Sequence, residues 1–327
     1  MDDARIAGGP PSGDGRNPNP HHAGAGIPVG KGPVLVTGAG GFVGQAVVSA
    51  LRAAGYEVRS VGRQDVGDIH RDTDWRAHLQ GVRAVVHLAA RVHVMRETAQ
   101  DPATAFREVN LFGTANLITQ ARDAGVHRFL FMSSIKVMGD QGWLLDPYSE
   151  PLPEDPYGVS KIEAELALRD LKGPDMDTLV LRPPLVYGPG VGGNFARLMR
   201  LIDRGIPLPL AAIDNERSLI FVENLADAVR HGLVCRPDTY HPKDGEDLST
   251  PGLIRRLAKA MGKPARLFPM PVFALKAAGL ATGRYQEVER LVNSLSVDGA
   301  MDGWQAPIPV DEGLARTVAG RHAGSRA

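Results

Sequence analysis

A tyrosine and a lysine four residues apart form the pair in this sequence best suited to proton transfer. The segment reads Pro156-Tyr-Gly-Val-Ser-Lys161, and residues at positions i and i+4 share one face of a helix. A free tyrosine has a pKa of about 10, and a nearby cation lowers that pKa by stabilising the phenolate. We expect Lys161 and the start of the helix to lower the pKa of Tyr157, so that it can act as a general acid and base near neutral pH.

Two adjacent serines, Ser133 and Ser134, follow an apolar run that predicts a strand at Phe129–Ser133. Parallel α/β sheets bind their ligands at the carboxyl ends of their strands. A hydroxyl at this position can hydrogen-bond a reacting oxygen. The alternative is that both serines terminate the strand by bonding backbone groups, and position alone leaves both interpretations open.

A glycine-rich turn follows the first predicted strand. The segment reads Val34-Leu-Val-Thr-Gly-Ala-Gly-Gly-Phe-Val-Gly44 and places Gly38, Gly41 and Gly44 three residues apart. Glycine allows backbone conformations and close approaches that a Cβ forbids. The helix that begins here offers free N–H groups and a positive dipole end to a pyrophosphate. A strand, a glycine turn and a helix in this order predict dinucleotide binding.

The end of the second predicted strand indicates which dinucleotide is bound. Sites that prefer NAD place an acidic residue there for the ribose 2′-hydroxyl, but strand Glu57–Val61 is followed by Gly62-Arg63. Arg63, with Arg59 as a second candidate, can pair with a 2′-phosphate. NADP(H) is therefore favoured. NAD(H) remains the alternative because Asp65 and Asp68 lie further on, and Arg63 can also be read as a solvated loop arginine.

Alternating strands and helices must position these groups. The sequence predicts an α/β fold, a doubly wound parallel sheet of the Rossmann type with a smaller C-terminal substrate-binding region. The apolar runs predict strands at Val34–Thr37, Glu57–Val61, Ala84–Ala89, Phe129–Ser133, Thr178–Leu181 and near Ser218–Val222. Helical spacing is found at Val43–Ala54, Thr104–Ala124 and Tyr157–Leu171.

The predicted organisation has three parts. Residues 1–32 are rich in Gly and Pro and have no apolar periodicity, which predicts a disordered tail. Residues 33–188 form mainly the dinucleotide-binding core. Regular alternation stops near Gly188, and residues 189–327 form mainly the substrate-binding region, interleaved with the last elements of the sheet.

Composition excludes several functional classes. The 327 residues include 37 basic and 37 acidic side chains, and this balance argues against a nucleic-acid partner. The single cysteine, Cys235, excludes an intramolecular disulfide and a thiolate metal cluster. His21 and His22 lie in the predicted tail and form no preorganised metal site, so no metal is expected. No apolar run approaches the length of about 20 residues that a membrane span needs, no secretory signal is seen, and a cytoplasmic location is expected.

Taken together, the motifs resemble the extended short-chain dehydrogenase/reductase family from Val34 to about Val318. They are Thr37-Gly-Ala-Gly-Gly-Phe-Val-Gly44, His87-Leu-Ala-Ala90, Ser133-Ser134, Tyr157-Gly-Val-Ser-Lys161 and Arg182-Pro-Pro-Leu-Val-Tyr-Gly-Pro-Gly190. Within the family the chain is similar to the nucleotide-sugar branch. The segments Ser133-Ser-Ile-Lys-Val-Met-Gly139 and Asp244-Gly-Glu-Asp-Leu-Ser-Thr250 resemble bacterial enzymes that act at C4 of UDP-linked sugars.

The resemblance implies roles for individual residues. The catalytic set is Ser134, Tyr157, Lys161 and Asn110. The cofactor set combines the glycines and Arg63, described above, with residues that the resemblance adds. It is Gly38, Gly41, Phe42, Val43, Gly44, Arg63, Asp68, Ile69, Ala89, Ala90, Tyr157, Lys161 and Pro184. The substrate set is Ser134, Asn194 and Arg217. For Arg217 the alternative is an ion pair with Glu216 or Glu223.

The resemblance also implies hydride transfer at C4 of a UDP-hexose, with proton transfer through Tyr157. The expected activity is that of a 4-ketoreductase for a UDP-4-keto-6-deoxy-N-acetylhexosamine in surface-polysaccharide synthesis. The alternatives are a UDP-glucose or UDP-N-acetylglucosamine 4-epimerase that retains NAD, and a non-catalytic protein that senses NADP. A 4,6-dehydratase is disfavoured because Ile135 and Lys136 stand where such enzymes carry acidic residues. The expected assembly is a homodimer.

Overall fold

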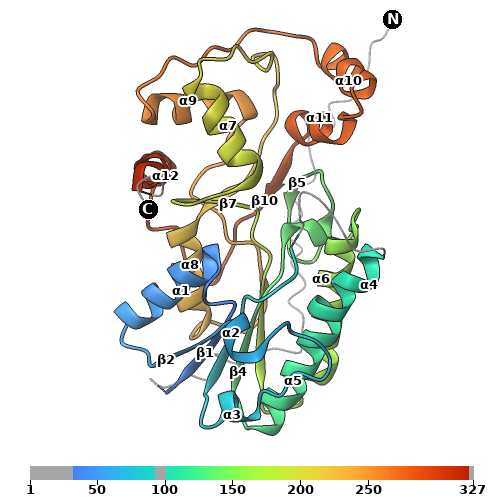
Figure 1. The fold of residues 1–327 in the computed structure, drawn as a ribbon, viewed down its shortest axis with the longest axis vertical. Helices are drawn as coiled ribbons and strands as arrows, with labels where there is room; N and C mark the ends of the chain where they lie inside the picture. The colour runs from blue at the N-terminus through green and yellow to red at the C-terminus, as the bar shows by residue number, and fades with distance from the viewer. Residues whose placement is uncertain (1–31, 93–100, 324–327) are drawn as a thin grey trace, which may run out of the picture.

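The computed structural model describes residues 32–92 and 101–323 of the chain (Figure 1). The predicted tail, residues 1–32 with His21 and His22, therefore lies outside the described residues except for Gly32. Within the described ranges, no helix is both long and apolar enough to cross a lipid bilayer.

A parallel sheet of six strands forms the centre of one half of the molecule. Its strand order is β2-β1-β3-β4-β6-β9, and every neighbouring pair is parallel. The strands are β1 (Val34–Thr37), β2 (Val58–Val61), β3 (Ala84–His87), β4 (Arg128–Met132), β6 (Asp177–Leu181) and β9 (Thr239–Tyr240). The prediction of a parallel, Rossmann-type α/β sheet is confirmed.

Helices cover both faces of this sheet, which explains why its strands are continuous apolar runs. Alternate residues of a strand point to opposite faces. Val34 and Val36 pack in the cluster that includes α1 (Phe42–Ala53) and α8 (Val222–Gly232). Leu35 packs in the cluster that includes α5 (Thr114–Asp123) and α6 (Pro156–Leu171). The remaining elements of this half are the short helices α2 (Arg63–Val66), α3 (Arg76–Leu79) and α4 (Pro102–Arg107).

The chain beyond residue 188 contributes to both halves of the molecule (Figure 1). Helix α8 packs on α1, and strand β9 pairs with β6 at the edge of the main sheet. The other half has its own apolar core, built from α7 (Gly193–Asp203), α9 (Thr250–Ala260), α12 (Val310–Ala323) and the small sheet of β7 (Leu185–Tyr187) and β8 (Leu219–Phe221). Also in this half are α10 (Val272–Ala281) and α11 (Tyr285–Val292).

Two parallel strands, β5 (Gly142–Leu145) and β10 (Leu295–Val297), connect the halves beside the end of β4. A 3₁₀ turn, η2 (Ile135–Met138), packs against them. The backbone of Ser218 donates a hydrogen bond to Leu295. These contacts fix the position of the segment after β4 relative to the C-terminal half.

The predicted helix over 104–124 has an irregularity that the sequence pattern did not indicate. The chain runs through α4, a π-helical segment η1 (Glu108–Gly113) and α5. A π-helical turn inserts an extra residue and turns one side chain out of the helical register, and such turns are frequent at functional sites. Asn110 lies in this segment. Strand β3 ends at His87, two residues before the predicted end, so Ala89 and Ala90 belong to a loop.

Candidate active site

The glycine-rich turn joins β1 to α1 at the carboxyl edge of the main sheet. Gly38 has a φ of +68°, and a Cβ there would lie 2.8 Å from the backbone nitrogen of Ala89. A Cβ on Gly44 would lie 2.2 Å from the carbonyl oxygen of Gly38. Both positions need glycine because the turn passes this close to neighbouring backbone. Gly41 begins α1 without a side-chain cap, so the first N–H groups of the helix face outward without a side-chain acceptor.

A cleft of about 1020 Å³ opens beside this turn. Its lining includes ten of the predicted cofactor residues, namely Gly38, Gly41, Phe42, Val43, Gly44, Arg63, Asp68, Ile69, Ala89 and Ala90. The cleft continues to Ala105 and Val109 on α4 and η1. Pro184 is buried between β6 and β7 and is not part of this lining. The structure therefore gathers residues from three separate loops around one elongated space.

The two candidate arginines for a 2′-phosphate have different positions. Arg63 is exposed at the cleft, and its Nε lies 2.7 Å from Oδ1 of Asp68. Arg59 donates through Nη1 to the carbonyl oxygens of His78 and Gln80, at 2.6 and 3.0 Å. Arg59 was a wrong candidate for binding a 2′-phosphate, because its guanidinium binds backbone carbonyls at α3 and Arg59 does not line the cleft.

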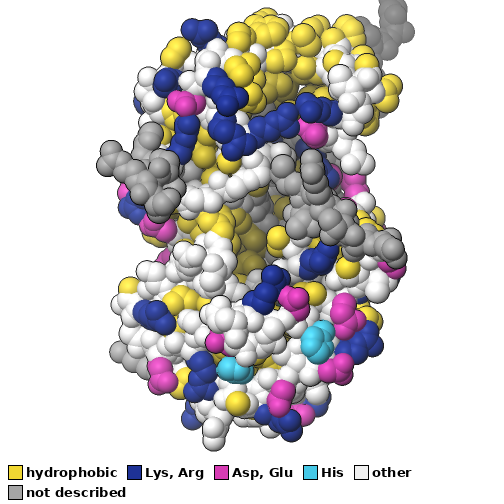
Figure 2. All heavy atoms as spheres, viewed as in Figure 1, with side chains coloured by type: hydrophobic (Ala, Val, Ile, Leu, Met, Phe, Trp, Pro, Cys, Tyr) yellow, Lys and Arg dark blue, Asp and Glu magenta, His cyan; other side chains and the backbone are white. Residues whose placement is uncertain are grey.

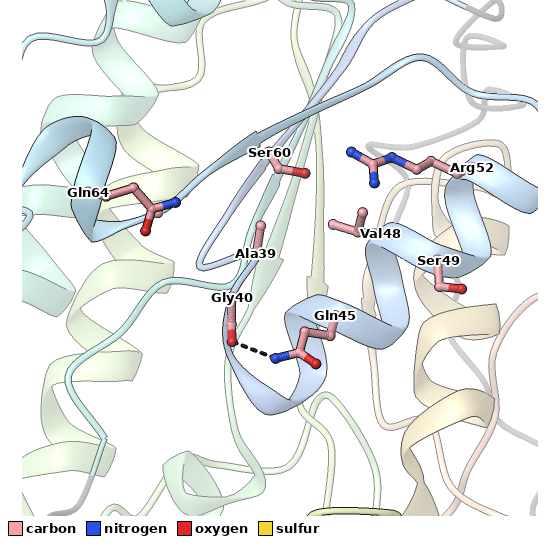
Figure 3. Close-up of a pocket in the computed structure, with 9 residues that line it drawn as sticks. Ala39, Gly40, Gln45, Val48, Ser49, Arg52, Ser60 and Gln64 are labelled. Carbon is pink, nitrogen blue, oxygen red and sulfur yellow. Dashed lines mark hydrogen bonds between the residues drawn. The ribbon is translucent and has the colours of Figure 1, made fainter. Parts of the chain in front are cut away.

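A second pocket, of about 570 Å³, adjoins the cleft and shares Gly40, Gly62 and Gln64 with it. Arg52 of α1 and Ser60 of β2 point toward one another across this pocket (Figure 3). The sequence analysis missed Arg52, Ser60 and Gln64. Only Ser60 could have been found from the sequence, because it is the polar residue that alternates with apolar ones on its strand. The position of Arg52 depends on how α1 packs.

Ser134 and Tyr157 meet where β4 ends and α6 begins. Asp155 caps α6 by accepting a hydrogen bond from the N–H of Gly158 at 2.7 Å, which fixes the start of the helix. The Ser134 hydroxyl lies near the phenol of Tyr157, and its interaction with the phenol lowers the pKa of Tyr157. The Tyr157 ring packs edge-on against Phe106 of α4, with 6.0 Å between the ring centroids. Helix α4 also borders the cleft through Ala105, but Tyr157 and Lys161, which were predicted to contact the cofactor, are not part of the cleft lining.

In the chain alone, Lys161 and the start of α6 do not lower the pKa of Tyr157; the part of the expected lowering that an oxidised nicotinamide would supply stays a prediction. Burial raises the pKa of Tyr157 to about 12, the hydrogen bond from Ser134 lowers it, and the Asp155 carboxylate raises it. Lys161 is not among the charges that set this pKa. The phenol is therefore held neutral, which is the form that donates a proton.

Lys161 is almost fully buried, with 1% of its surface exposed. Its Nζ lies over the ring of Phe131, 4.0 Å from the centroid. Burial lowers the pKa of Lys161 to about 7, and the Glu165 carboxylate acts in the opposite direction. The ammonium therefore titrates near neutral pH.

This pKa predicts how stability depends on pH. Between about pH 7 and the usual lysine pKa, the unfolded chain binds a proton at Lys161 that the folded chain does not bind, so the free energy of unfolding rises with pH. We expect K161M to lose this rise, whose slope is at most about 1.4 kcal/mol per pH unit. Urea unfolding at several pH values measures it. K259M, at an exposed lysine, should keep the wild-type slope, and an unchanged slope in K161M would contradict the assignment.

The other serine, Ser133, has a structural partner. Its hydroxyl donates to the carboxylate of Glu165, which also forms an ion pair with Arg182 at 2.6 Å. Both charged side chains are buried. Arg182 donates further to the carbonyl oxygen of Pro147 at 3.1 Å. The interpretation that both serines bond backbone groups does not hold for Ser133, which bonds a side chain. It holds in part for Ser134, whose Oγ accepts a hydrogen bond from the N–H of Lys136 at 3.2 Å and which also lies near the phenol of Tyr157.

The sequence analysis missed Glu165 as a supporting residue. A signal was present, because Glu165 lies four residues after Lys161 and eight after Tyr157 on the same helix face. Its carboxylate connects α6 to the end of β6 through Arg182. The ion pair fixes the helix that carries Tyr157 against the sheet.

Asn110 was predicted to be catalytic, but its contacts are those of a positioning residue. Its Oδ1 accepts from the N–H of Arg91 at 2.8 Å, and its Nδ2 donates to the Arg91 carbonyl at 3.0 Å and to Ser160 Oγ at 2.9 Å. Both donors of the amide are therefore used. The side chain fastens the loop after β3, which carries Ala89 and Ala90, to helix α6.

Of the predicted substrate residues, Asn194 is exposed near the start of α7. Arg217 lies just before β8 and donates through Nη1 to the carbonyl oxygens of Arg290 and Asn293, at 2.6 and 3.1 Å. The alternative of an ion pair with Glu216 or Glu223 is not realised. Among the described residues, no hydrogen bond or ion pair joins Asn194 to Arg217.

A chain of contacts connects Arg217 to the catalytic turn. Arg290, whose carbonyl Arg217 binds, pairs through Nε with Asp140 at 3.0 Å. Asp140 also pairs with Lys136, and the N–H of Lys136 donates to Ser134 Oγ at 3.2 Å. Arg217, Lys136 and Arg290 therefore form a basic group around one aspartate, between the Tyr157 site and the C-terminal half.

Comparison with known proteins identifies the family. Residues 34–237 match the model of the NAD dependent epimerase/dehydratase family. A UDP-glucose 4-epimerase of Vibrio cholerae is 41% identical over 314 residues, which cover 87% of this chain and 94% of that protein. The structure of MoeE5 with UDP-glucuronic acid and NAD has a TM-score of 0.71 at 24% identity, covering 90% of this chain and all of that one (100%). A human epimerase family protein, SDR39U1, with NADPH has a TM-score of 0.68 at 21% identity, covering 88% and 99%.

The family match spans the glycine turn, Ser134, Tyr157 and Lys161. The similarity to the Vibrio cholerae relative extends over most of both chains. The chain belongs to the NAD-dependent epimerase/dehydratase family, in the nucleotide-sugar epimerase branch of the extended short-chain dehydrogenases/reductases.

Proposed function

We propose that this protein is an NAD(P)-dependent oxidoreductase that acts at C4 of a UDP-hexose. The observation that carries the proposal is that Ser134 and Tyr157 lie together, with buried Lys161 on the same helix. Tyr157 packs on α4, and α4 borders the cleft at the carboxyl edge of the sheet. Such an edge is where open α/β sheets bind ligands. The 41% identical relative, named a UDP-glucose 4-epimerase, supports the substrate class.

The residues that line the cleft fit a nicotinamide dinucleotide. The uncapped N–H groups at the start of α1 suit the pyrophosphate, and the glycines keep the backbone open to it. Arg63 suits a 2′-phosphate, and the adjacent pocket with Arg52, Ser60 and Gln64 offers further donors. We infer a preference for NADP(H), since no carboxylate follows β2 at Gly62-Arg63.

The C-terminal half supports a nucleotide-sugar substrate. Arg217 carries a cation at the boundary between the halves, and its guanidinium suits a diphosphate. The contacts through Asp140 and Lys136 hold Arg217 in register with Ser134. A UDP-sugar bound with its diphosphate at Arg217 would extend its sugar toward Tyr157. Residues 189–327 then supply most of the substrate-binding region, with Asn194 as a second contact.

The protein groups supply the proton chemistry of such a reaction. When bound, the reduced nicotinamide supplies the hydride. Tyr157, held as a neutral phenol by burial, donates its proton to the C4 alkoxide. Ser134 hydrogen-bonds the same oxygen, and Lys161 lies one turn further along α6, on the face that carries Tyr157. Asn110 keeps the loop with Ala89 and Ala90 in place beside α6.

Between the two nucleotide-sugar activities, we infer a 4-ketoreductase for a UDP-4-keto-6-deoxy-N-acetylhexosamine. The basis is Gly62-Arg63 after β2, where no carboxylate stands for the ribose of a retained NAD. A reductase exchanges its cofactor at every turnover. The second candidate is a UDP-glucose or UDP-N-acetylglucosamine 4-epimerase, which retains NAD. The name of the Vibrio cholerae relative favours this candidate.

The cofactor carried by the purified protein separates the two candidates. The experiment denatures fresh protein and quantifies the nucleotide that is released. We expect an empty protein that then binds NADPH better than NADH. Near-stoichiometric NAD would favour the epimerase and would make Arg63 a bystander. Failure to bind either nicotinamide cofactor would contradict the enzyme proposal itself.

A substitution at Arg63 tests the cofactor preference. R63D replaces a cation that suits a 2′-phosphate by an anion that repels it, so the ratio of NADPH to NADH affinity should fall by about 10–100-fold. Isothermal titration measures both affinities. R76D changes an exposed arginine that also pairs with a nearby aspartate, outside the cleft, and should leave the ratio unchanged. A ratio that stays the same or rises in R63D would overturn the preference for NADP(H).

A further inference from the structure

Helix α10 exposes an apolar face to solvent at the end of the molecule farthest from the main sheet (Figure 1). Phe273, Ala277, Leu280 and Ala281 are spaced i, i+4, i+7 and i+8, which places them on one face, and all four are exposed. Phe273 is 76% exposed and Leu280 is 72% exposed. A whole helix face of this kind marks an interaction surface, unlike a single exposed apolar residue.

The opposite side of α10 packs against α11. Leu275 and Gly279 are buried, and a Cβ on Gly279 would lie 2.8 Å from a methyl group of Val288 on α11. The only charged residue of α10, Lys276, pairs with Glu289 of α11 at 2.8 Å. The helix thus directs its polar group inward to α11 and its apolar groups outward.

Exposed aromatic residues continue this surface on both sides of the helix. Phe268 precedes α10 and Tyr285 begins α11, and each has about two-fifths of its side chain exposed (41% and 42%). Figure 2 shows hydrophobic side chains gathered at this end of the molecule, with a row of Lys and Arg side chains below them. We call the surface formed by Phe268, Phe273, Ala277, Leu280, Ala281 and Tyr285 the α10 surface.

Cationic side chains outnumber acidic ones around the α10 surface, where Glu287 and Glu289 of α11 pair with Arg197 and Lys276. The 39 residues 248–286 contain seven Lys or Arg residues and no Asp or Glu. Arg284, the residue before α11, is exposed, and Arg266 donates to the carbonyl oxygen of Gly205. Within the described part of the chain, neither arginine forms an ion pair with a carboxylate. Lys263 is compensated by Asp203, at 3.7 Å.

We propose that the α10 surface docks on the surface of an anionic phospholipid bilayer. An apolar helix face bordered by cations is the composition that inserts between headgroups while Lys and Arg contact their phosphates. The aromatic side chains of Phe268, Phe273 and Tyr285 suit the boundary between headgroups and acyl chains. Arg266 and Arg284, which form no ion pair with a carboxylate among the described residues, argue for an anionic surface, because such a surface attracts unpaired cations. This docking is peripheral and leaves the cleft, in the other half, open to water.

Vesicle sedimentation tests the proposal with the full-length protein. Wild-type protein should sediment with vesicles of phosphatidylcholine and phosphatidylglycerol, and much less with vesicles of phosphatidylcholine alone. F273E/L280E should lower the partition coefficient on the anionic vesicles by about 100-fold or more. R284Q should lower it about fivefold, and added salt should weaken the binding of the wild type.

V234E is the matched control, because Val234 is an exposed apolar residue in the half that holds the main sheet. It should bind as the wild type does. All variants are checked by circular dichroism and size-exclusion chromatography. The proposal is overturned if the wild type ignores anionic vesicles, or if F273E/L280E binds them as well as V234E does. It is also overturned if F273E/L280E only converts an oligomer to a monomer, since the surface would then contact a second copy of the chain.

Discussion

Replacing Tyr157 by phenylalanine is expected to lower kcat by about 10²–10⁴-fold. The variant removes the hydroxyl that Ser134 hydrogen-bonds, while the ring can keep its edge-on contact with Phe106. Because the phenol is the proton donor in the proposed reaction, the loss should appear in kcat and leave the affinity for the nicotinamide cofactor unchanged. Steady-state kinetics and titration of NADPH measure the two quantities separately.

The control is Y148F, since Tyr148 is an exposed tyrosine whose hydroxyl donates to Asp238. Its kcat should match that of the wild type. If Y157F kept full activity, Tyr157 would not be the proton donor. If the wild type bound NADPH but turned over no nucleotide sugar, the protein would fit the non-catalytic sensor of NADP that the sequence left as an alternative.

Removing Arg182 is expected to cost about 3–5 kcal/mol of stability. In R182M the carboxylate of Glu165 stays buried with only the Ser133 hydroxyl and the charge of Lys161 as compensation, because the ion pair at 2.6 Å is gone. An uncompensated buried charge is costly, whereas removal of both charges is much less so. The free energy of unfolding, measured by urea titration, should therefore be partly restored in E165Q/R182M.

The matched control for this prediction is R122M. Arg122 forms an exposed ion pair with Asp123 at 2.8 Å, and such pairs contribute about 0–1 kcal/mol. A loss in R182M no larger than that of R122M would show that the buried pair does not hold α6 against the sheet. A double variant no more stable than R182M would show that the uncompensated charge is not the cause.

The parts of the fold that follow from local chemistry could be predicted from the sequence. The apolar runs of β1, β3 and β4 are buried on both faces, so their pattern is continuous and strong. The glycine turn could be placed because Gly38 and Gly44 tolerate no side chain, a property of the turn itself. Strand β9, in contrast, has two residues, and only its pairing with β6 makes it a strand.

The parts of the site that depend on packing could not be predicted. Spacing places Tyr157 and Lys161 on one helix face, but burial, which sets their pKa values, comes from elements far away in sequence. The same holds for Arg59, which the packing of α3 draws away from the cleft. Asn110 lies in a π-helical segment that no periodicity indicates, and only the structure shows its amide on the backbone of Arg91.

The most direct test of the central claim follows hydride into the sugar. The protein is incubated with UDP-4-keto-6-deoxy-N-acetylglucosamine and NADPH that carries deuterium at C4 of the nicotinamide, and the product is examined by NMR. A 4-ketoreductase with Tyr157 as its acid predicts one deuterium at C4 of the sugar and stoichiometric oxidation of NADPH. An unchanged keto sugar, together with interconversion of UDP-glucose and UDP-galactose that takes up no deuterium, would contradict the reductase and assign the epimerase activity instead.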